Sequence, residues 1–431
     1  MNILLIGNGF DLEHGLPTKY SDFLEFCKRL EPIHAFPYCL ACTKASFQTA
    51  YLNQWNISQS IKDTLLHAFE SRTVTKQVNN EEATLFYEVK TDMGFLDEMY
   101  SLTHTNAWLQ YFFKRSSCIG ENWIDFESEI SHVVQTLDYV QKHTPPGGVH
   151  GELPEPYNTC LVNITKAAHF SFSRYSNHIE ALQQLTNLLD SELNRFIRAF
   201  EIYLSVFVNS IPVERTCADI EHLLPDCVLS FNYSNTYERI YGQSREISYD
   251  FIHGKADAGN TIDSCNMVLG IDEYLDDSRK KEELAFLSFK KYYQRIYKAT
   301  GNAYLTWVDC LKKEYAEFVE QEKYAEQRRG YSYGKSALTM SKKLFQPSLH
   351  MHTLSIFGHS LDKTDKDILK SLICNDNVKT KIYYYQEYAH DKRTLGKLIK
   401  NLVYIMGPDE LIRRTGGPHK TIEFIPQTLH E

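Results

Sequence analysis

The chain of 431 residues carries 43% hydrophobic and 23% charged residues, the proportions of a globular protein that can bury its own core. This composition excludes a disordered or fibrous chain. Lysine and arginine number 46 against 55 aspartate and glutamate, and the net charge of −9 weighs against a general nucleic-acid binder, which needs clustered cations.

The first predicted element is a buried strand, Ile3 to Ile6, which runs into a turn made by Gly7, Asn8, Gly9, Phe10 and Asp11. An amphipathic helix is predicted to follow from Tyr20. A strand, a glycine turn and a helix open a Rossmann-like fold, in which backbone N–H groups of the turn can approach a phosphate or ribose. The Gly-x-Gly-x-x-Gly fingerprint is incomplete because position 12 is Leu12, so a tight turn without a ligand is the alternative.

Residues 36–219 are predicted to form a large helical insertion, with apolar stripes beginning at Trp123 and Ile179 and a loop at Pro145 to Gly148. Asp125 and Glu129 lie four residues apart on another face of the first helix, with Glu127 between them. Close carboxylates can hold a metal or serve as acid and base, and a solvated face is the alternative.

Short apolar runs return after Pro225, at 227–231, 249–252, 267–271, 354–357, 382–385 and 422–425. Helices are predicted between several of them, near 281–324, 365–373 and 390–405. Buried runs that alternate with helices predict a mostly parallel sheet covered on both faces. We therefore predict an α/β, Rossmann-like core built from residues 1–35 plus 220–431.

Polar residues follow two of these strands, where ligands bind in open α/β sheets. The first group is Asn232, Ser234, Asn235 and Thr236, which could instead cap the next helix. The second is His253 with Gly254. Histidine is a natural general base near neutral pH, and a glycine lets a substrate approach the backbone.

Gly358, His359 and Ser360 follow a later strand and predict a second nucleotide-facing loop, with a helix cap at Asp362 or Thr364 as the alternative. No metal site is predicted. Cys39 and Cys42 form a single Cys-x-x-Cys pair, and His350 and His352 have no acidic or cysteine companion nearby in the sequence.

The N-terminus from Asn2 to Leu24 closely resembles the bacteriophage abortive-infection AbiH family. Other stretches fit the same pattern in order: Trp123-x-Asp125-Phe126-Glu127, Phe231-Asn232-Tyr233-Ser234-x-Thr236, Ile252-His253-Gly254 and Gly358-His359-Ser360-x-Asp362. Together they cover nearly the whole chain. The resemblance implies a bacterial, intracellular protein that limits phage spread, and it supplies no reaction by itself.

A more distant resemblance is to sirtuin-like domains, which bind NAD. These domains have a glycine-rich loop, an Asn-x-Asp strand end, a catalytic His-Gly and a later Gly-x-Ser loop. The chain is similar in the order of its turn at Gly7, its Asn232, its His253 and its loop at Gly358. It departs from the pattern at Ser234, which stands where an aspartate is expected, and it lacks a four-cysteine zinc module, so deacetylation is disfavoured.

This second resemblance implies NAD, or another nucleotide, as the bound molecule and no metal. The catalytic residues are expected to be Asn232, His253 and Asp11, with Asn232 orienting the ribose and a water and His253 acting as general base. The nucleotide is expected to contact Gly7, Asn8, Gly9, Phe10, Ser234, Gly254, Gly358, His359 and Ser360.

The implied reaction is hydrolysis of the nicotinamide–ribose bond, an NAD glycohydrolase activity. Two alternatives stay open: a non-catalytic nucleotide sensor or switch that acts with a partner, and a metal-dependent nuclease that uses Asp125, Glu127 and Glu129. A nuclease is disfavoured by the acidic net charge.

The chain shows no export signal and no stretch of about 20 apolar residues, so we expect a cytoplasmic protein without a membrane partner. Sensing of a phage-derived trigger or self-association is expected to use the helical insertion. A partner defence protein is the alternative to a homo-oligomer. Most of the abundant aromatic residues are expected in the core, while Phe10, Phe231, Tyr233 and Phe251 are expected to flank the site.

Overall fold

The structure is a computed structural model. It describes residues 1–35, 94–119, 125–143, 153–213, 215–242, 245–275, 279, 284–330, 348–386 and 393–428, with the strands at 73–78 and 81–86 and the single residues 52, 53, 59, 62, 63 and 66. Trp123, the loop at Pro145 to Gly148, and the pair Cys39 and Cys42 lie outside these residues.

A sheet of six parallel strands forms the core of the molecule. Its strands are β1 (Asn2–Ile6), β4 (Cys227–Ser230), β5 (Ser248–Phe251), β6 (His352–Phe357), β7 (Val378–Tyr384) and β8 (Ile422–Pro426). Their spatial order is β5-β4-β1-β6-β7-β8. The chain starts in the middle, adds two strands on one side and then three on the other, which is the 3-2-1-4-5-6 order of the Rossmann fold. The predicted α/β fold is confirmed.

The register of the strands aligns their carboxyl ends. Ile6 at the end of β1 pairs with Ser230 at the end of β4 and with Phe357 at the end of β6. The loops that follow these three strands therefore emerge side by side. The strand order also reverses direction between β1 and β6, so this edge is the topological switch point of the sheet.

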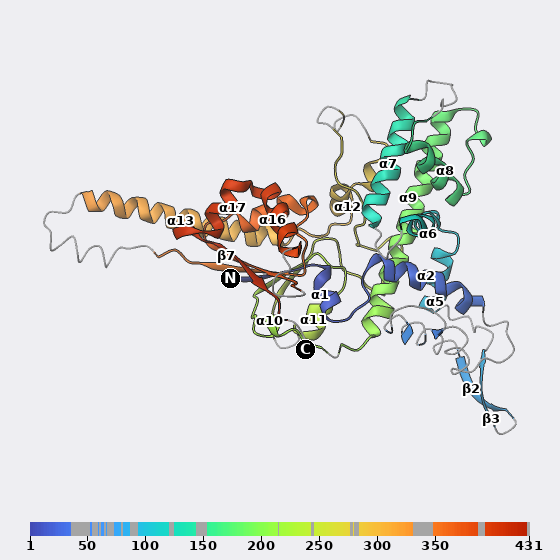
Figure 1. The fold of residues 1–431 in the computed structure, drawn as a ribbon, viewed down its shortest axis with the longest axis horizontal. Helices are drawn as coiled ribbons and strands as arrows, with labels where there is room; N and C mark the ends of the chain where they lie inside the picture. The colour runs from blue at the N-terminus through green and yellow to red at the C-terminus, as the bar shows by residue number, and fades with distance from the viewer. Residues whose placement is uncertain are drawn as a thin grey trace.

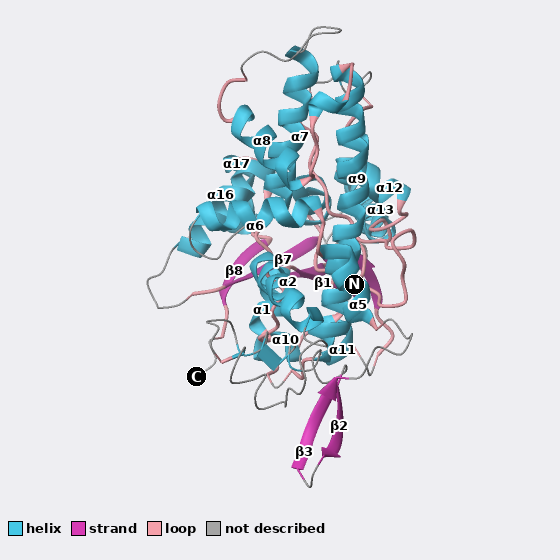
Figure 2. Ribbon diagram, turned by 90° about the vertical axis from the view of Figure 1, so that its right-hand side faces the viewer, coloured by secondary structure: helices cyan, strands magenta, loops and turns pink. Residues whose placement is uncertain are grey.

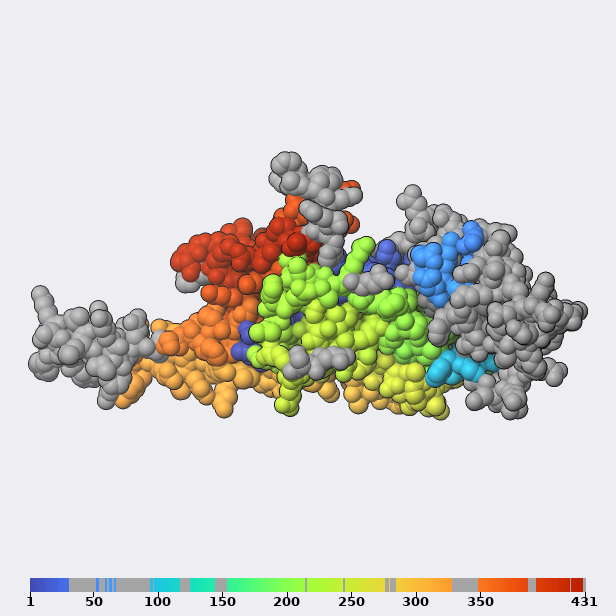
Figure 3. Space-filling model, turned by 90° about the horizontal axis from the view of Figure 1, so that it is seen from below, coloured from blue at the N-terminus to red at the C-terminus, as the bar shows by residue number. Residues whose placement is uncertain are grey.

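Helices cover both faces of the sheet (Figure 2), which explains why its central strands are apolar on both sides. One face packs against α13 (Tyr304–Gly330), α15 (Lys366–Ile373), α16 (Arg393–Met406) and α17 (Pro408–Thr415). The other face packs against α1 (Asn8–Glu13), α10 (Ala218–Glu221) and α11 (Thr236–Ile240). In the view from below, the segment that carries α10, α11 and β5 fills the middle of the surface (Figure 3).

A layer of helices lies beside the sheet (Figure 1). It contains α2 (Tyr20–Ala35), α5 (Phe95–Thr103), α6 (Ala107–Ile119), α7 (Phe126–His143), α8 (Tyr157–Ala167) and α9 (His178–Ile202). These helices share one core, and stacked and edge-on rings fill its centre, among them Phe23, Phe112, Phe126 and Phe196. The core also includes residues between Ala256 and Phe289. The helical layer therefore packs with two segments from outside residues 36–219, namely α2 and this later segment.

Three elements differ from the sequence prediction. The turn predicted from Gly7 to Asp11 is mostly the short helix α1, which begins at Asn8. A hairpin of β2 (Thr73–Val78) and β3 (Glu81–Phe86) interrupts the predicted helical insertion and projects away from the sheet (Figure 1). The apolar run at 267–271 is not a strand of the sheet. The Gln294 side chain bonds both the N–H and the C=O of Leu269, and Tyr233 donates to the carbonyl of Val268. The N–H groups of Val268 and Ile271 donate to isolated backbone carbonyls, so side chains and scattered backbone contacts take the place of a neighbouring strand.

Among the described residues, no helix combines the length and the apolar character needed to cross a membrane.

Candidate functional site

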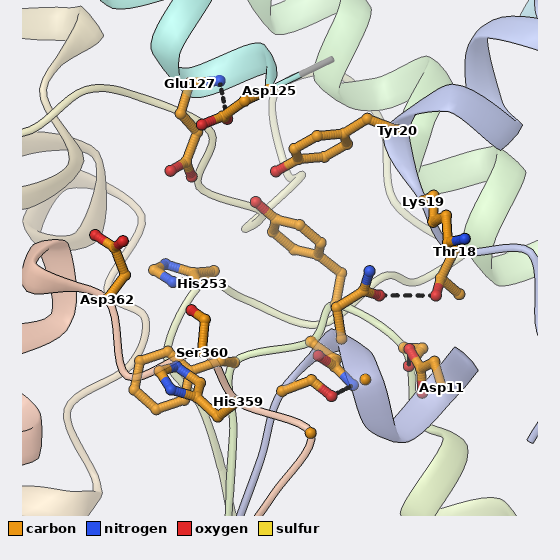
Figure 4. Close-up of a pocket in the computed structure, with 18 of the residues that line it drawn as sticks. Asp11, Thr18, Lys19, Tyr20, Asp125, Glu127, His253, His359, Ser360 and Asp362 are labelled. Atoms are coloured by element: carbon orange, nitrogen blue, oxygen red, sulfur yellow. Dashed lines mark hydrogen bonds between the residues drawn. The ribbon is translucent and has the colours of Figure 1, made fainter. Parts of the chain in front are cut away.

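A cavity of about 540 Å³ opens at the carboxyl ends of β1, β4 and β6. It lies at the switch point of the sheet, where open α/β folds bind their ligands. The loops after the three strands line one side (Figure 4). The helical layer lines the other side, through Tyr20, Asp125, Glu127, Phe200 and Leu204.

The glycines at the switch point let two loops touch. The N–H of Gly7 donates to the carbonyl of Phe357 at 3.1 Å, and the N–H of Gly9 donates to that of Gly358 at 2.9 Å. A Cβ atom on Gly9 would lie 2.8 Å from the Cα of Gly358. The N–H of Phe10 donates to the carbonyl of Gly7 at 2.8 Å. These three amide donors are used inside the protein, so other groups must supply the donors for a phosphate.

Asp11 is the buried acid of the cavity, and its side chain lines it. The Ser234 hydroxyl donates to Oδ2 of Asp11 at 2.6 Å, and the Thr236 hydroxyl donates to that of Ser234 at 3.0 Å. The other oxygen, Oδ1, has no hydrogen-bond partner among the described residues. Burial raises the pKa of Asp11 to about 6, in spite of the hydrogen bond from Ser234. Among the described residues, Asp11 therefore brings a buried acceptor without a partner to the lining of this cavity.

Asn232 and Asn8 hold the loops around this acid in place. The side-chain amide of Asn232 donates to the carbonyl of Gly7 at 3.0 Å and so ties the end of β4 to the turn after β1. The Thr18 hydroxyl donates to Oδ1 of Asn8 at 2.8 Å (Figure 4). Both asparagines line the cavity while bonding to the protein.

His253 is a buried, neutral imidazole on the same wall of the cavity. Burial and the nearby Lys291 charge lower its pKa to about 3. Its Nδ1 has no hydrogen-bond partner in the part of the chain that the structure describes, and its Nε2 lies 3.9 Å from Oδ1 of Asp365. The ring therefore offers an acceptor or donor to a bound molecule and resists full protonation.

His359 has a fixed orientation beside it. Its Nδ1 accepts a hydrogen bond from the N–H of Leu361 at 2.9 Å, so the proton of the neutral ring is on Nε2, 3.4 Å from Oδ2 of Asp365. Burial alone would raise the pKa of Asp365, but the hydrogen bond from His359 and the positive charge of Lys291 outweigh burial and lower the pKa. Asp365 is therefore a stable carboxylate.

An ion pair closes the helical side of the cavity. Nζ of Lys291, the first residue of α12 (Lys291–Tyr297), lies 2.6 Å from Oε2 of Glu127. Burial raises the pKa of Glu127 to about 7 although Lys291 opposes the shift. At the start of α7, Oδ1 of Asp125 accepts a hydrogen bond from the N–H of Glu127 at 3.1 Å. Glu129 faces away and pairs with Arg115 at 2.9 Å, so Asp125 and Glu127 reach the cavity and Glu129 does not.

Most of the predicted site residues line this one cavity. They are Gly7, Asn8, Gly9, Asp11, Asn232, Ser234, His253, Gly358, His359 and Ser360. Phe10 and Gly254 do not line it. Phe10 is fully buried against Tyr237 and Phe357, and Gly254 serves a tight turn with a φ of +82° against the backbone of Asn266.

Of the four aromatic residues that were predicted to flank the site, two line the cavity and two do not. Phe231 and Tyr233 line the cavity. Phe231 lies between the two histidines, with ring centroids 4.3 Å from His359 and 5.7 Å from His253. Phe251 is not among the lining residues and carries the Lys255 ammonium over its ring.

Sequence reasoning missed Lys19, Tyr20 and Lys291 as lining residues. Tyr20 could be recognised in the sequence as the first apolar position of a predicted helix, but this position indicates core packing as much as a place in the cavity. Lys291 could not be recognised in the sequence, because only the packing of α12 against α7 brings it to Glu127.

The family model for bacteriophage abortive infection AbiH matches residues 3–386. The chain belongs to the AbiH family. The match contains every residue that lines the cavity, and membership gives this AbiH protein a role in phage abortive infection. No curated protein and no solved structure matches the chain.

Proposed function

We propose that this AbiH protein binds a nucleotide in the switch-point cavity and hydrolyses its glycosidic bond, with NAD as the substrate. The observation that carries the proposal is the buried carboxylate of Asp11, a residue that lines a cavity of nucleotide size. One oxygen accepts a hydrogen bond from Ser234, and the other has no partner among the described residues. Such a group is suited to meet a positive charge that develops in the cavity.

The position of Asp11 accounts for the departure at Ser234 from the sirtuin-like pattern. The hydroxyl of Ser234 bonds the carboxylate of Asp11, so helix α1, which follows β1, supplies an acid next to Asn232. A serine in place of an aspartate is then compatible with an acid at this position.

The charges of the lining favour a substrate whose reacting end is cationic. In the part of the chain that the structure describes, five acids line the cavity, against two lysines, Lys19 and Lys291. The acids are Asp11, Asp125, Glu127, Asp362 and Asp365. Lys291 is paired with Glu127, so Lys19 is the cation that remains for a diphosphate. The nicotinamide ring of NAD is a pyridinium cation, which an acidic wall attracts.

The reaction needs little more than charge stabilisation and a placed water. When the bond between C1′ of the ribose and the ring nitrogen breaks, its electron pair neutralises the pyridinium, and nicotinamide leaves without a proton. Positive charge develops on the ribose, where the carboxylate of Asp11 stabilises it. Water adds to C1′, with His253 as hydrogen-bond acceptor, and its proton passes to Asp11, whose pKa of about 6 allows release to solvent.

The test is nicotinamide release from NAD by the purified protein, alone and with lysate of phage-infected cells. We expect Asp11→Asn, Asn232→Ala and His253→Ala each to abolish release. Asp367→Asn is the matched control, because Asp367 is exposed on α15 and does not line the cavity. Absence of nicotinamide under every activating condition would overturn the proposal. Calorimetric binding of NAD without release would instead indicate a nucleotide sensor.

A nuclease is the second candidate, because Asp125 and Glu127 both reach the cavity. Against it, the described residues of the cavity contain no group of three side chains placed to share a metal ion. Cleavage of phage DNA or of tRNA with Mg²⁺, lost in Asp125→Asn, would favour this function over the first.

A further inference from the structure

Metal-ligating side chains converge at the other end of the sheet, near the amino ends of the parallel strands. They come from α13, which runs along the sheet and extends past it, and from the start of β6 (Figure 1). Nδ1 of His350 and Nε2 of His352 each lie 3.0 Å from Oε2 of Glu314. All three ligand atoms lie within 4.8 Å of one another.

The alternation of side chains near the start of β6 brings the two histidines together. His350 and His352 are two residues apart, so they share one face of the extended chain, and their ring centroids are 4.6 Å apart. Glu314 is 36 residues earlier in the chain, on α13, which explains why no acidic companion is visible near the histidines in the sequence.

The buried imidazole of His352 has one nitrogen that is placed to bind a ligand. Its side chain is 1% exposed, and its Nδ1 lies 3.2 Å from the nitrogen of Met1. Its Nε2 has no hydrogen-bond partner among the described residues, although Oε2 of Glu314 is 3.0 Å away, because the atoms are not aligned for a hydrogen bond. A buried nitrogen that contacts a carboxylate without bonding to it is suited to share a cation with that carboxylate.

A thiol lies one helical turn before the glutamate. Sγ of Cys310 is 3.3 Å from Oε1 of Glu314, and Cys310 is exposed on the same face of α13. Its position four residues before Glu314 places the two side chains on one face of the helix.

We propose that Glu314, His350 and His352 bind one divalent transition-metal ion, with zinc as the reference. Cys310, which contacts the other carboxylate oxygen of Glu314, is the candidate for a fourth ligand. Imidazole, carboxylate and thiolate form a ligand set that suits zinc and its neighbours, whereas magnesium and calcium prefer oxygen alone. Zinc bonds to nitrogen and oxygen of about 2.0–2.2 Å place tetrahedral ligand atoms roughly 3.3 Å apart, close to the spacing of this cluster.

The ion would fasten α13 to the first residue of β6. Coordination through Nε2 would leave the ring proton of His352 on Nδ1, which faces the nitrogen of Met1. None of the four side chains lines the switch-point cavity, so this site is separate from the proposed nucleotide site and does not depend on it.

Zinc binding to the full-length protein, stripped with a chelator, tests the proposal by calorimetry and by metal analysis after dialysis. We expect the wild type to bind a single equivalent that His350→Ala does not bind. The loss should be at least the roughly ten- to hundred-fold weakening that even outer-shell changes cause. His350 is 67% exposed on its side chain, so its removal should leave the fold intact.

The control is His222→Ala, an exposed histidine outside the cluster, which should bind zinc as the wild type does. Cobalt serves as a spectroscopic probe: the wild type should show thiolate-to-cobalt charge-transfer absorption, and Cys310→Ser should lose it. Equal zinc affinity in the wild type and in His350→Ala would overturn the site. Cobalt binding without the charge-transfer band would remove Cys310 from the ligand set.

Discussion

Two aspartates in the same cavity have opposite electrostatic environments. Asp11 is fully buried and accepts one hydrogen bond from a neutral hydroxyl, so burial raises its pKa to about 6. Asp365 faces two histidines and Lys291, which lower its pKa although burial opposes them. Separated pKa values in one cavity are typical of sites where one acid exchanges protons and another holds its neighbours in place.

Asp11→Asn should therefore stabilise the protein while removing its function. Between pH 3.8 and about 6 the native carboxyl retains a proton that the unfolded chain has lost, so its contribution to stability falls as the pH rises through this window. Asparagine avoids this cost and still accepts the Ser234 hydrogen bond. We expect a gain of about 1–3 kcal/mol in the free energy of unfolding at pH 7, measured by urea denaturation, and little gain at pH 4.

Asp365→Asn should have the opposite effect. The lowered pKa of Asp365 gives stability that is present above the unfolded pKa, near 3.8, and is lost as the pH falls through the native value. The variant should lose about 1–2 kcal/mol at pH 7, as expected when a charged hydrogen bond is weakened. Its difference from the wild type should shrink below pH 4. An unchanged free energy of unfolding at pH 7, equal to that of the Asp367→Asn control, would contradict this assignment.

At the scale of elements, the contact between the turn after β1 and the loop after β6 sets the shape of the site. Gly358 has a φ of +68°, and a Cβ atom there would meet the backbone nitrogen of Phe10. Gly358→Ala should therefore cost at least about 2 kcal/mol, from left-handed backbone strain and from the clash. Thermal and urea unfolding measure this loss.

Gly396→Ala is the matched substitution for that test. Gly396 lies in α16, is exposed, and has open space around its Cα. Alanine should stabilise this helix by up to about 1 kcal/mol. A loss at Gly396 as large as that at Gly358 would show that the loop contact is not what requires the glycine.

The strands were predictable because each is a short apolar run that ends in polar residues. The runs at 227–231, 354–357 and 422–425 correspond to β4, β6 and β8, and the residues that follow the first two reach the cavity. The run at 267–271 has the same composition but a different environment, since the side chains of Gln294 and Tyr233 and isolated backbone contacts bond its backbone groups. Local pattern cannot distinguish a partner strand from partner side chains.

At the scale of the whole molecule, the cavity has two sides of different origin. The sheet side follows from strand order and could be predicted from sequence. The helical side depends on how α2, α7, α9 and α12 pack, which no local pattern encodes, and it contributes Tyr20, Glu127, Phe200 and Lys291. Tertiary packing also explains the contact between His350 and Glu314, which are distant in the sequence and adjacent in the fold.

The pair of Lys291 and Glu127 joins α12 to α7 at the rim of the cavity, so it should couple the two helices energetically. Lys291→Met leaves Glu127 partly buried without its partner, which costs more than the pair itself contributes. Glu127→Gln removes a carboxyl whose pKa is raised to about 7 and whose cost grows as the pH rises from 4.5. The double variant should therefore be more stable than Lys291→Met alone.

A double-mutant cycle in urea measures this coupling, and we expect about 1–3 kcal/mol at pH 7.5. The coupling should fall at pH 5, where Glu127 binds a proton more readily. The exposed pair of Lys420 and Glu423, with Nζ and Oε1 3.9 Å apart, provides the control cycle and should give less than about 1 kcal/mol. Equal coupling in the two cycles would mean that the buried contact between Lys291 and Glu127 joins α12 to α7 no more strongly than an exposed ion pair would.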